Sequence, residues 1–524
     1  MSLPTRRIML FVFLAVLAPL GTALALGPDS DHQRPALTAQ EEAQWLTALV
    51  QASPHYALWQ QMPPEPPLAP PTRIAAPTAP NAAPAKSAWP AKPGRRVFGY
   101  LPYWTKDSAL LPWNSLTQVA WFSAGISASG EVTSLAGWNS TASKDFIATA
   151  HSKGVQVVLT FTQFDTAAIS KIVATTTSRQ IAVDSIIATV LAGGGDGCSM
   201  DFEGLAKADR EQYKAFIALL KSEMQAKLPG GDVTMATPAV DWSSAWDYQY
   251  LAEHSDGLMI MAYAIHWGGG NPGPQLPMAA DKPWTSKTLQ WILDDYFKYA
   301  KPQNKDKIIV GLPLYGMAWL SESDKPGAAK LANGKSVTYA AAQVAAPKNG
   351  GWLWDKGSAS SYYLTQDAAG WTQTWVDNFA AFELRMDYLD SKDVHIGLWA
   401  LGYANAYPEV WGKIKAWQDK AAPAVGADAV ADGGAVADAV TAADAAADAA
   451  AAADAVAAAD AVAAAAADAV PETAAPDAAA PTATAPVAAS SGCAAALWPD
   501  RAGWAWALLA GIGICARRRF RCAR

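Results

Sequence analysis

The chain has 524 residues, more than one hydrophobic core usually organises, so we expect several domains or one large barrel with appended segments. Its net charge of −7 argues against nucleic-acid binding, which needs clustered Lys and Arg, and its four cysteines are too few for a disulfide-stapled scaffold. Tryptophan is abundant, with 23 residues, and its flat rings suit sugar rings as well as protein cores.

Residues 1–25 have the composition of a secretory signal peptide. Two arginines precede an apolar run from Ile8 to Leu20, and an Ala-Leu-Ala sequence ends the stretch. We therefore expect an exported protein, located at the cell surface or outer envelope or in the medium. The arginine pair leaves open whether the general or the twin-arginine export route is used.

Residues 26–94 predict a helix followed by a linker. The helix is expected around Glu41 to Met62. Residues 63–93 are rich in Pro and Ala, a composition typical of a spacer that contributes nothing to a core.

Residues 95–418 predict an α/β fold, a (β/α)8 TIM barrel. Short β-branched or aromatic runs alternate with amphipathic stretches, as in parallel strands joined by helices. Helices are expected at 143–153, 178–191, 207–228 and 378–391. The eight predicted strands are Val97–Trp104, Gln118–Ser123, Val155–Phe161, Gly197–Glu203, Asp232–Thr237, Gly257–Tyr263, Lys307–Leu314 and His395–Ala400.

A small α+β insertion is expected after the seventh strand, at about residues 318–377. This stretch is too long for a simple loop, and we expect it to form a β-rich lid beside the barrel mouth. Within it, Asn333-Gly334 predicts a hairpin turn.

Residues 419–492 predict a stalk, and residues 493–524 predict a sorting or anchor segment. The stalk is almost entirely Ala, Asp, Val, Pro and Thr, and its like charges repel one another. An apolar run of 14 residues from Gly503 to Ala516, short for a bilayer span, ends in an arginine cluster. The order of cysteine, apolar run and arginines resembles the C-terminal sorting tails of myxobacterial surface proteins, and an ordinary membrane anchor is the alternative.

The predicted strand Gly197–Glu203 carries the most specific chemical signal. With a period of two residues, Ser199, Asp201 and Glu203 point into the barrel, and Glu203 lies at the rim where barrel enzymes build their sites. Two carboxylates this close do not both ionise freely, so we expect one raised pKa, as a general acid requires. The alternative is a strand end whose acids are solvated or paired with Arg or Lys.

The stretch from Asp196 to Glu203 resembles the Asp-x-x-Asp-x-Asp-x-Glu motif of glycoside hydrolase family 18, with Ser199 in place of the second Asp. The resemblance covers residues 95–418 and points to the chitinase or spore-cortex branch. It continues in four further strands, Gly99-Tyr100-Leu101-Pro102-Tyr103-Trp104, Met261-Ala262-Tyr263, Gly311-Leu312-Pro313-Leu314-Tyr315-Gly316 and Gly397-Leu398-Trp399-Ala400.

The resemblance implies a substrate-assisted mechanism. Glu203 would protonate the glycosidic oxygen, and the acetamido carbonyl of the sugar would act as nucleophile. Asp201 would hold the acetamido N–H, Tyr263 would bond its carbonyl oxygen, and Trp399 would form an apolar floor. Further substrate contacts are expected from Tyr100, Asp196, Ser199, Met261, His266 and Trp267, and for Trp399, Tyr100 and His266 simple packing is the alternative.

Three positions depart from the family pattern. Ser199 does not store charge as an Asp would, Ala264 stands where the family usually has Asp, and Thr160-Phe161-Thr162-Gln163 replaces a Ser-x-Gly-Gly sequence. These departures keep a second hypothesis open, a catalytically weak or inactive, lectin-like barrel that binds glycan.

We therefore expect an exported, surface-anchored glycosidase that hydrolyses β-1,4 bonds at N-acetylglucosamine residues. Whether the glycan is chitin or peptidoglycan, and whether cleavage is endo or exo, stays open, and a structural envelope protein is a third alternative. No cofactor or metal is expected, because no His, Cys or Asp cluster has ligand spacing. The expected partners of this monomer are the polysaccharide and, through the C-terminal segment, the membrane.

Overall fold

The computed structural model describes residues 38–53, 55–56, 60, 95–105 and 110–420, all within one compact unit. The predicted signal peptide, the linker at 63–93, nearly all of the stalk and the C-terminal segment lie outside the described residues. No helix in the described part of the chain is both long enough and apolar enough to cross a membrane.

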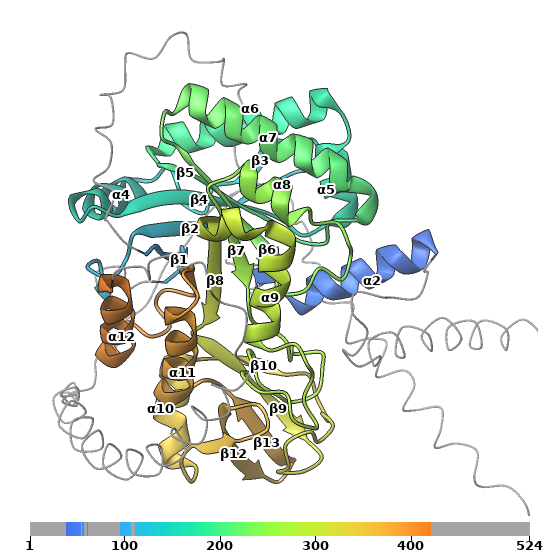
Figure 1. The fold of residues 1–524 in the computed structure, drawn as a ribbon, viewed down its shortest axis with the longest axis vertical. Helices are drawn as coiled ribbons and strands as arrows, with labels where there is room; N and C mark the ends of the chain where they lie inside the picture. The colour runs from blue at the N-terminus through green and yellow to red at the C-terminus, as the bar shows by residue number, and fades with distance from the viewer. Residues whose placement is uncertain (1–37, 54, 57–59, 61–94, 106–109, 421–524) are drawn as a thin grey trace, which may run out of the picture. The chain divides into compact units, whose positions relative to one another are not determined.

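Eight parallel strands close into a barrel, which confirms the TIM-barrel prediction (Figure 1). Phe98 of the first strand lies opposite Gly397 of the last, and Tyr100 lies opposite Ala120 of the second, so the ring is complete. A short antiparallel strand, β3 (Val132–Ser134), pairs with β2 outside the ring. The ring consists, in order, of β1 (Val97–Pro102), β2 (Gln118–Ile126), β4 (Gln156–Gln163), β5 (Gly197–Phe202), β6 (Asp232–Pro238), β7 (Gly257–Met261), β8 (Ile308–Pro313) and β14 (His395–Trp399).

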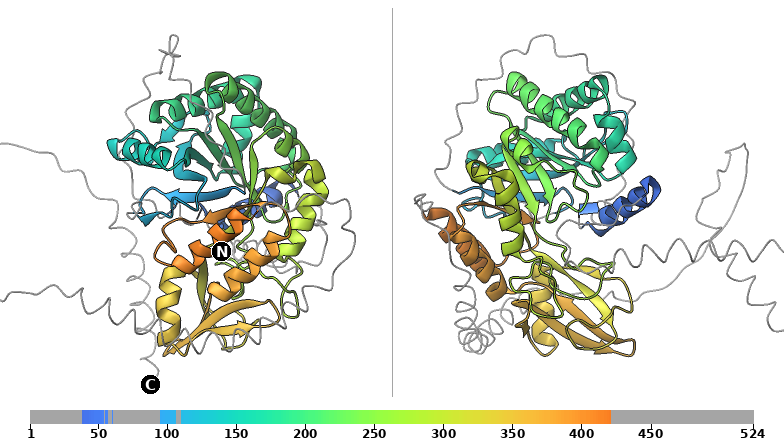
Figure 2. Two further views of the ribbon diagram at one scale, coloured as in Figure 1. Left: turned by 60° about the vertical axis from the view of Figure 1, so that its left-hand side comes forward. Right: turned by 45° about the vertical axis from the view of Figure 1, so that its right-hand side comes forward.

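Helices surround the barrel (Figure 2). The four predicted helices are present with ends within three residues of those expected. Side-chain caps explain several starts, because Ser140, Thr175 and Asn378 each accept a backbone N–H of the first turn. The outer helices are α4 (Thr141–Ser152), α5 (Thr166–Val173), α6 (Thr176–Gly193), α7 (Arg210–Lys227), α8 (Tyr248–Glu253), α9 (Leu289–Ala300), α11 (Phe379–Asp390) and α12 (Pro408–Asp419).

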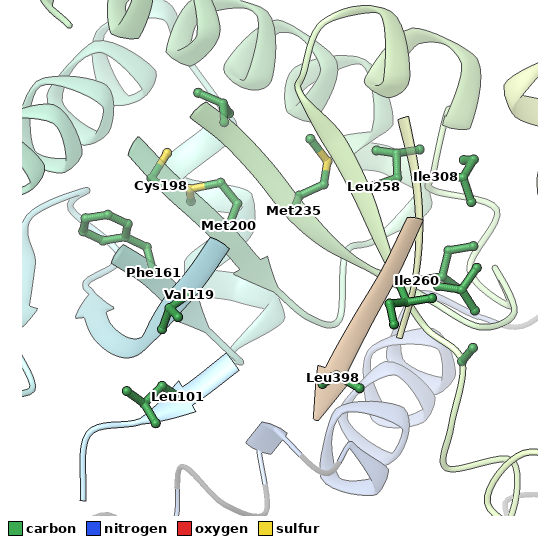
Figure 3. Packing of buried hydrophobic residues seen from close by; sticks show 14 of the residues in the cluster. Leu101, Val119, Phe161, Cys198, Met200, Met235, Leu258, Ile260, Ile308 and Leu398 are labelled. Carbon is green, nitrogen blue, oxygen red and sulfur yellow. The ribbon is translucent and has the colours of Figure 1, made fainter. Parts of the chain in front are cut away.

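The strands are buried on both faces, as parallel strands between a barrel interior and a helix layer must be. Outward side chains such as Leu101, Phe161 and Met200 share one apolar layer with the helices (Figure 3). Inward side chains form a second, more aromatic cluster that includes Tyr100 and Trp399. The alternation within each strand thus separates the structural layer from the barrel interior.

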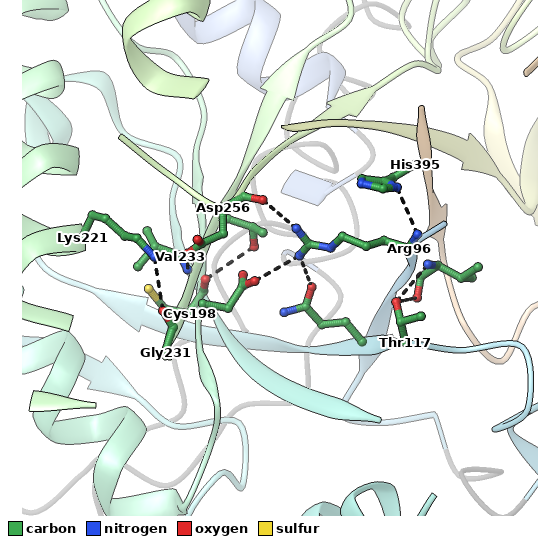
Figure 4. A network of polar contacts seen from close by, with 12 residues as sticks. Arg96, Thr117, Cys198, Lys221, Gly231, Val233, Asp256 and His395 are labelled. Carbon is green, nitrogen blue, oxygen red and sulfur yellow. Dashed lines mark hydrogen bonds and ion pairs between the residues drawn. The ribbon is translucent and has the colours of Figure 1, made fainter. Parts of the chain in front are cut away.

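A polar network closes the amino-terminal end of the barrel (Figure 4). Arg96 donates to the Asp256 carbonyl at 2.6 Å, to Gln118 Oε1 at 2.6 Å and to Asp232 Oδ2 at 3.1 Å. The carboxylate of Asp256 pairs in turn with Lys221. Burial raises the pKa of Asp232, and the Arg96 guanidinium opposes that shift.

The insertion after β8 is a five-stranded antiparallel sheet with one helix, which confirms the predicted α+β insertion. The strand order is β10-β9-β13-β12-β11, and all neighbouring pairs are antiparallel. The elements are β9 (Tyr315–Ser321), β10 (Lys335–Thr338), α10 (Tyr339–Lys348), β11 (Leu353–Asp355), β12 (Ser360–Asp367) and β13 (Gly370–Trp375).

The predicted hairpin turn at Asn333-Gly334 is wrong. β9 and β10 do pair, but residues 322–334 connect them, and the two residues lie at the end of this connection. A Cβ at Gly334 would lie 2.6 Å from Trp319 Nε1, and the Gly334 N–H donates to the Gly268 carbonyl at 2.8 Å. The glycine therefore permits a close approach, which a sequence pattern does not distinguish from a turn.

The predicted helix at 41–62 is wrong at its carboxyl end, because helix α2 spans only Ala39–Ala52. Thr38 and Glu41 form a capping box at its start. Ser53 is already extended, with φ −65° and ψ 134°, as expected for a residue that precedes a proline. The predicted single helix is therefore interrupted at Ser53, and His55 and Tyr56 are helical again beyond it.

We predict that Arg96→Leu destabilises the barrel, because it leaves the buried Asp232 carboxylate without its cation. The expected cost is about 3 kcal/mol, measured as a lower urea midpoint of unfolding. Lys227→Met is the matched control, since Lys227 and Asp184 are 41% and 54% exposed. That exposed pair should contribute less than about 1 kcal/mol, and an equal shift in both variants would contradict a role of burial.

Candidate active site

Six of the predicted site residues meet at the carboxyl end of the barrel. Asp201 lies in β5, Glu203 follows the last residue of that strand, and Tyr263 follows β7 by two residues. Tyr100 and Trp399 bring their ring centroids within 5.3 Å, and Tyr100 Oη lies 3.1 Å from Ser199 Oγ. The period of two along β5 thus aims both carboxyl groups at the buried aromatic cluster that includes Tyr100, Tyr263 and Trp399.

The two carboxyl groups differ in their surroundings. Burial raises the pKa of Glu203 well above its usual value, the nearby Asp201 carboxylate raises it further, and a hydroxyl hydrogen bond from Ser53 opposes both. The raised pKa favours the protonated form of Glu203, which is the form a general acid needs. Asp201 is fully buried, and among the described residues its Oδ1 has no hydrogen-bond partner.

The hydroxyl groups of Tyr263 and Tyr100 keep their protons. Burial raises the pKa of both side chains well above the usual value for tyrosine. For Tyr100 the Asp201 carboxylate adds to the effect, while the hydrogen bond with Ser199 opposes it. Both groups can therefore donate a hydrogen bond in this site, which is what an acceptor oxygen on a ligand needs.

The structure places Met261 beside this cluster but leaves His266 and Trp267 in a neighbouring loop. Met261 ends β7 and is buried in the same aromatic cluster as Tyr263. His266 Nδ1 lies 3.2 Å from the Asn271 carbonyl, and burial lowers its pKa to about 4, so the ring is neutral at pH 7. The ring of Trp267 covers Gly269, where a Cβ would lie 1.9 Å from it.

The structure does not bring Asp196 to the site. Asp196 precedes β5, at the opposite end of this strand from Glu203, and it is buried. Its Oδ2 accepts from the Val157 backbone N–H at 2.7 Å and lies 2.8 Å from His151 Nε2. These contacts tie the start of β5 to β4 at the bottom of the barrel.

Two residues outside the barrel, Ser53 and His55, lie in the site. Ser53 Oγ donates to Glu203 Oε1 at 2.6 Å. His55 places Nδ1 2.9 Å from Asp201 Oδ2 and Nε2 2.8 Å from the Tyr263 hydroxyl. Its ring stacks on Trp399, with centroids 3.7 Å apart and planes inclined by 28°.

Sequence reasoning missed both residues. His55 and Asp201 are 146 positions apart, and Ser53 and Glu203 are 150 positions apart. The only local signal is a Ser-Pro-His sequence directly after an amphipathic helix, which has no specific chemical meaning.

The same fold brings together a possible metal-ligand set that sequence spacing does not reveal. One ligand atom each from His55, Asp201 and Glu203 lies within 4.8 Å of the others. The hydrogen bond between His55 and Asp201 and that between Ser53 and Glu203 account for this approach without an ion.

Comparison with known proteins gives the fold and the family context. The family model "Glycosyl hydrolases family 18" matches residues 96–404. A Bacillus subtilis (strain 168) protein predicted to be a sporulation-specific glycosylase, YdhD, is 27% identical over 251 residues, which cover 46% of this chain and 56% of the relative. The chain thus spans little more than half the length of that relative.

Two solved structures share the fold. The Ostrinia furnacalis Group IV chitinase, in complex with allosamidin, has a TM-score of 0.55 and 16% identity, over 62% of this chain and 98% of its own. The Bacillus cereus spore cortex-lytic enzyme SleL has a TM-score of 0.51 and 20% identity, over 62% of this chain and 74% of its own. At these identities the likeness concerns the fold alone.

Proposed function

The chain belongs to glycosyl hydrolase family 18, and from this premise we propose that it hydrolyses β-1,4 bonds at N-acetylglucosamine residues of a glycan polymer. The observation that carries the proposal is the buried pair of Asp201 and Glu203 at the carboxyl end of β5, where burial and the Asp201 carboxylate raise the pKa of Glu203. Two candidate polymers are chitin and cortex peptidoglycan, since a chitinase and a spore cortex-lytic enzyme share this fold. Both contain N-acetylglucosamine.

The proposed mechanism assigns one role to each group of the site. Glu203 donates its proton to the glycosidic oxygen while the acetamido carbonyl oxygen attacks C1, so the leaving sugar departs as an alcohol and an oxazolinium forms. Asp201 accepts from the acetamido N–H, and the Tyr263 hydroxyl donates to the carbonyl oxygen. Water then attacks C1, Glu203 takes its proton, and the anomeric configuration is retained.

The apolar side of the sugar requires a flat partner, and Trp399 supplies one. Its indole is 1% exposed, ends β14 and already carries a stacked ring in this structure, that of His55. A pyranose ring presents C–H groups of similar extent to such a face. Tyr100 and Phe122 pack edge-on against the indole and hold it in place.

A lectin-like barrel is the second candidate, because Ser199 and Ala264 replace acids of the family pattern. The Ser199 hydroxyl bonds Tyr100 and leaves Asp201 without a charged neighbour on its own strand. The retained Glu203, with its raised pKa, favours the enzyme, since binding alone needs no buried acid.

We predict that Glu203→Gln abolishes hydrolysis and leaves glycan binding intact, because the amide keeps the shape but has no proton to donate. The turnover number should fall at least ~100-fold. Since His55 occupies the same site, the comparison is made both in the natural chain and in a His55→Ala background. Glu211→Gln, whose side chain is 71% exposed, is the matched control, and turnover above about a tenth of the control value would exclude Glu203 as the acid.

We predict that the substrate must carry a 2-acetamido group, because the sugar itself supplies the nucleophile. N-acetylglucosamine tetramers should be cut with retention of configuration, as followed by NMR of the released anomer. Glucosamine and glucose tetramers with the same β-1,4 linkage are matched controls that lack the carbonyl. Measurable cleavage of either control would contradict a substrate-assisted mechanism.

We propose, in addition, that the protein is exported and held at the cell surface by residues 493–524. The signal-peptide composition of residues 1–25 and the arginine cluster at the C-terminus support this proposal. The last described helix, α12, ends at Asp419, so the proposed anchor is separated in sequence from the barrel.

We predict that deletion of residues 493–524 releases an active enzyme into the medium. The deletion removes no residue of the barrel, so activity on soluble N-acetylglucosamine oligomers should be unchanged. Cell fractionation of the full-length and shortened chains measures the location, and a truncated protein that stays cell-bound would contradict the anchor. A released but inactive protein would place the domain boundary elsewhere.

A further inference from the structure

The N-terminal segment, residues 38–53 with 55 and 56, fills the site that the proposed function requires to be open. Its Ser53 and His55 are 7% and 0% exposed. Between them they contact the acid, the second carboxylate, the tyrosine hydroxyl and the tryptophan face.

The segment is anchored on the rim beside the site. Val50 of helix α2 packs over Gly204, where a Cβ would lie 2.6 Å from Val50 Cγ2. Tyr56 packs edge-on against Phe164, with centroids 5.5 Å apart. These partners follow β5 and β4, and Figure 1 shows α2 outside the ring of barrel helices. The segment is thus held by its own apolar contacts on both sides of His55.

The local conformation aims both polar groups into the site. Ser53 Oγ accepts from the backbone N–H of His55 at 3.1 Å and from that of Tyr56 at 3.4 Å. Ser53 thus caps the helical turn that contains His55 and Tyr56, and its hydroxyl proton is left free to be donated to Glu203. The same turn directs the His55 ring inward, between Trp399 and the two acids.

The imidazole of His55 presents the same pattern of groups as an acetamido sugar. A carboxylate only accepts, so Nδ1 donates its N–H to Asp201, as the acetamido N–H would. When the ring is neutral, Nε2 then accepts from the Tyr263 hydroxyl, as the acetamido carbonyl oxygen would. The flat ring covers Trp399, as the sugar would, and the Ser53 hydroxyl donates to Oε1 of the general acid Glu203.

We propose that the N-terminal segment is an intramolecular inhibitor that binds as a substrate mimic and must be displaced before glycan enters. The inference rests on the proposed function, since the mimicry is to N-acetylglucosamine. A tethered ligand acts at an effective concentration on the order of millimolar, so even weak docking competes with free oligomers. The apparent affinity for glycan then falls in proportion to the open fraction of molecules.

His55→Ala in the full chain tests the inhibition. The variant should lower the apparent KM for an N-acetylglucosamine tetramer at least tenfold, with kcat unchanged, and Ser53→Ala should act in the same direction with a smaller effect. Gln51→Ala, on the exposed side of helix α2, is the matched control and should change neither constant. Equal KM values for the natural chain and His55→Ala would overturn the proposal, as would a fall in kcat, which would give His55 a part in the reaction.

A second measurement reports docking without any activity. Diethyl pyrocarbonate modifies accessible neutral imidazoles, and peptide mass mapping gives the rate for each histidine. In the natural chain without glycan, His55 should react at least tenfold more slowly than the partly exposed His254. Asp201→Ala, which removes one hydrogen bond of the ring, should raise the rate at His55. A rate at His55 equal to that at His254 in the natural chain would overturn the proposal.

The two measurements separate failure of the inference from failure of the proposed function. In a Glu203→Gln chain, which binds without cutting, a saturating N-acetylglucosamine tetramer should raise the reaction rate at His55. Protection that persists with the tetramer, while His55→Ala gains no affinity for it, would mean that the segment docks but the site does not take this glycan. If the chain cleaves the tetramer while His55 is unprotected, the proposed glycosidase activity stands and the proposed inhibition by the N-terminal segment is contradicted.

Discussion

The structure depends on the cost of placing two carboxyl groups a few ångströms apart in a nearly dry barrel mouth. Burial and the Asp201 charge both disfavour ionisation of Glu203 and raise its pKa. Asp201, which only accepts, must then be met by donors, and the structure supplies one from His55. The aromatic walls are part of the same constraint, because they exclude the water that would otherwise solvate both charges. The burial of the two carboxyl groups thus explains both the raised pKa of Glu203 and the hydrogen bond that His55 makes with Asp201.

The two ends of the barrel have different roles: polar contacts link the strands at the amino-terminal end, and the acids lie at the carboxyl end. At the amino-terminal end, Arg96 joins several strands through one guanidinium, and Asp196 ties β5 to its neighbour. At the carboxyl end, the same strand presents Asp201 and Glu203. Along β5, Met200 and Phe202 pack outward in the apolar layer while the alternate residues face inward. One strand of six residues, together with Glu203 directly after it, therefore contributes to stability with one face and carries the acids on the other.

The parts of this molecule that could be predicted from sequence are those that follow from local periodicity. Eight strands and the insertion follow from alternating apolar runs and from spacing, and Asp201 and Glu203 follow from the period of β5. The end of helix α2 at Ser53 was missed because the amphipathic pattern continues past the proline that follows Ser53. The role of Gly334 was missed because it comes from the close approach of Trp319, which is distant in sequence. His55 was not predictable, because its meaning comes only from contacts made across 146 positions.

The N-terminal segment affects the pKa of Glu203 in two opposite ways. A ligand that replaces the segment changes both effects. The segment adds to the burial that raises the pKa of Glu203, while the Ser53 hydroxyl bond favours the charged form. A glycan that displaces the segment removes the hydroxyl bond and must restore the cover over Trp399 and the two acids. A sugar ring stacked on the indole, with its acetamido group between Asp201 and Tyr263, does both. Because the Ser53 hydroxyl bond lowers the pKa of Glu203, a ligand that removes this bond and keeps the site covered would shift that pKa upward, in the direction that general acid catalysis requires.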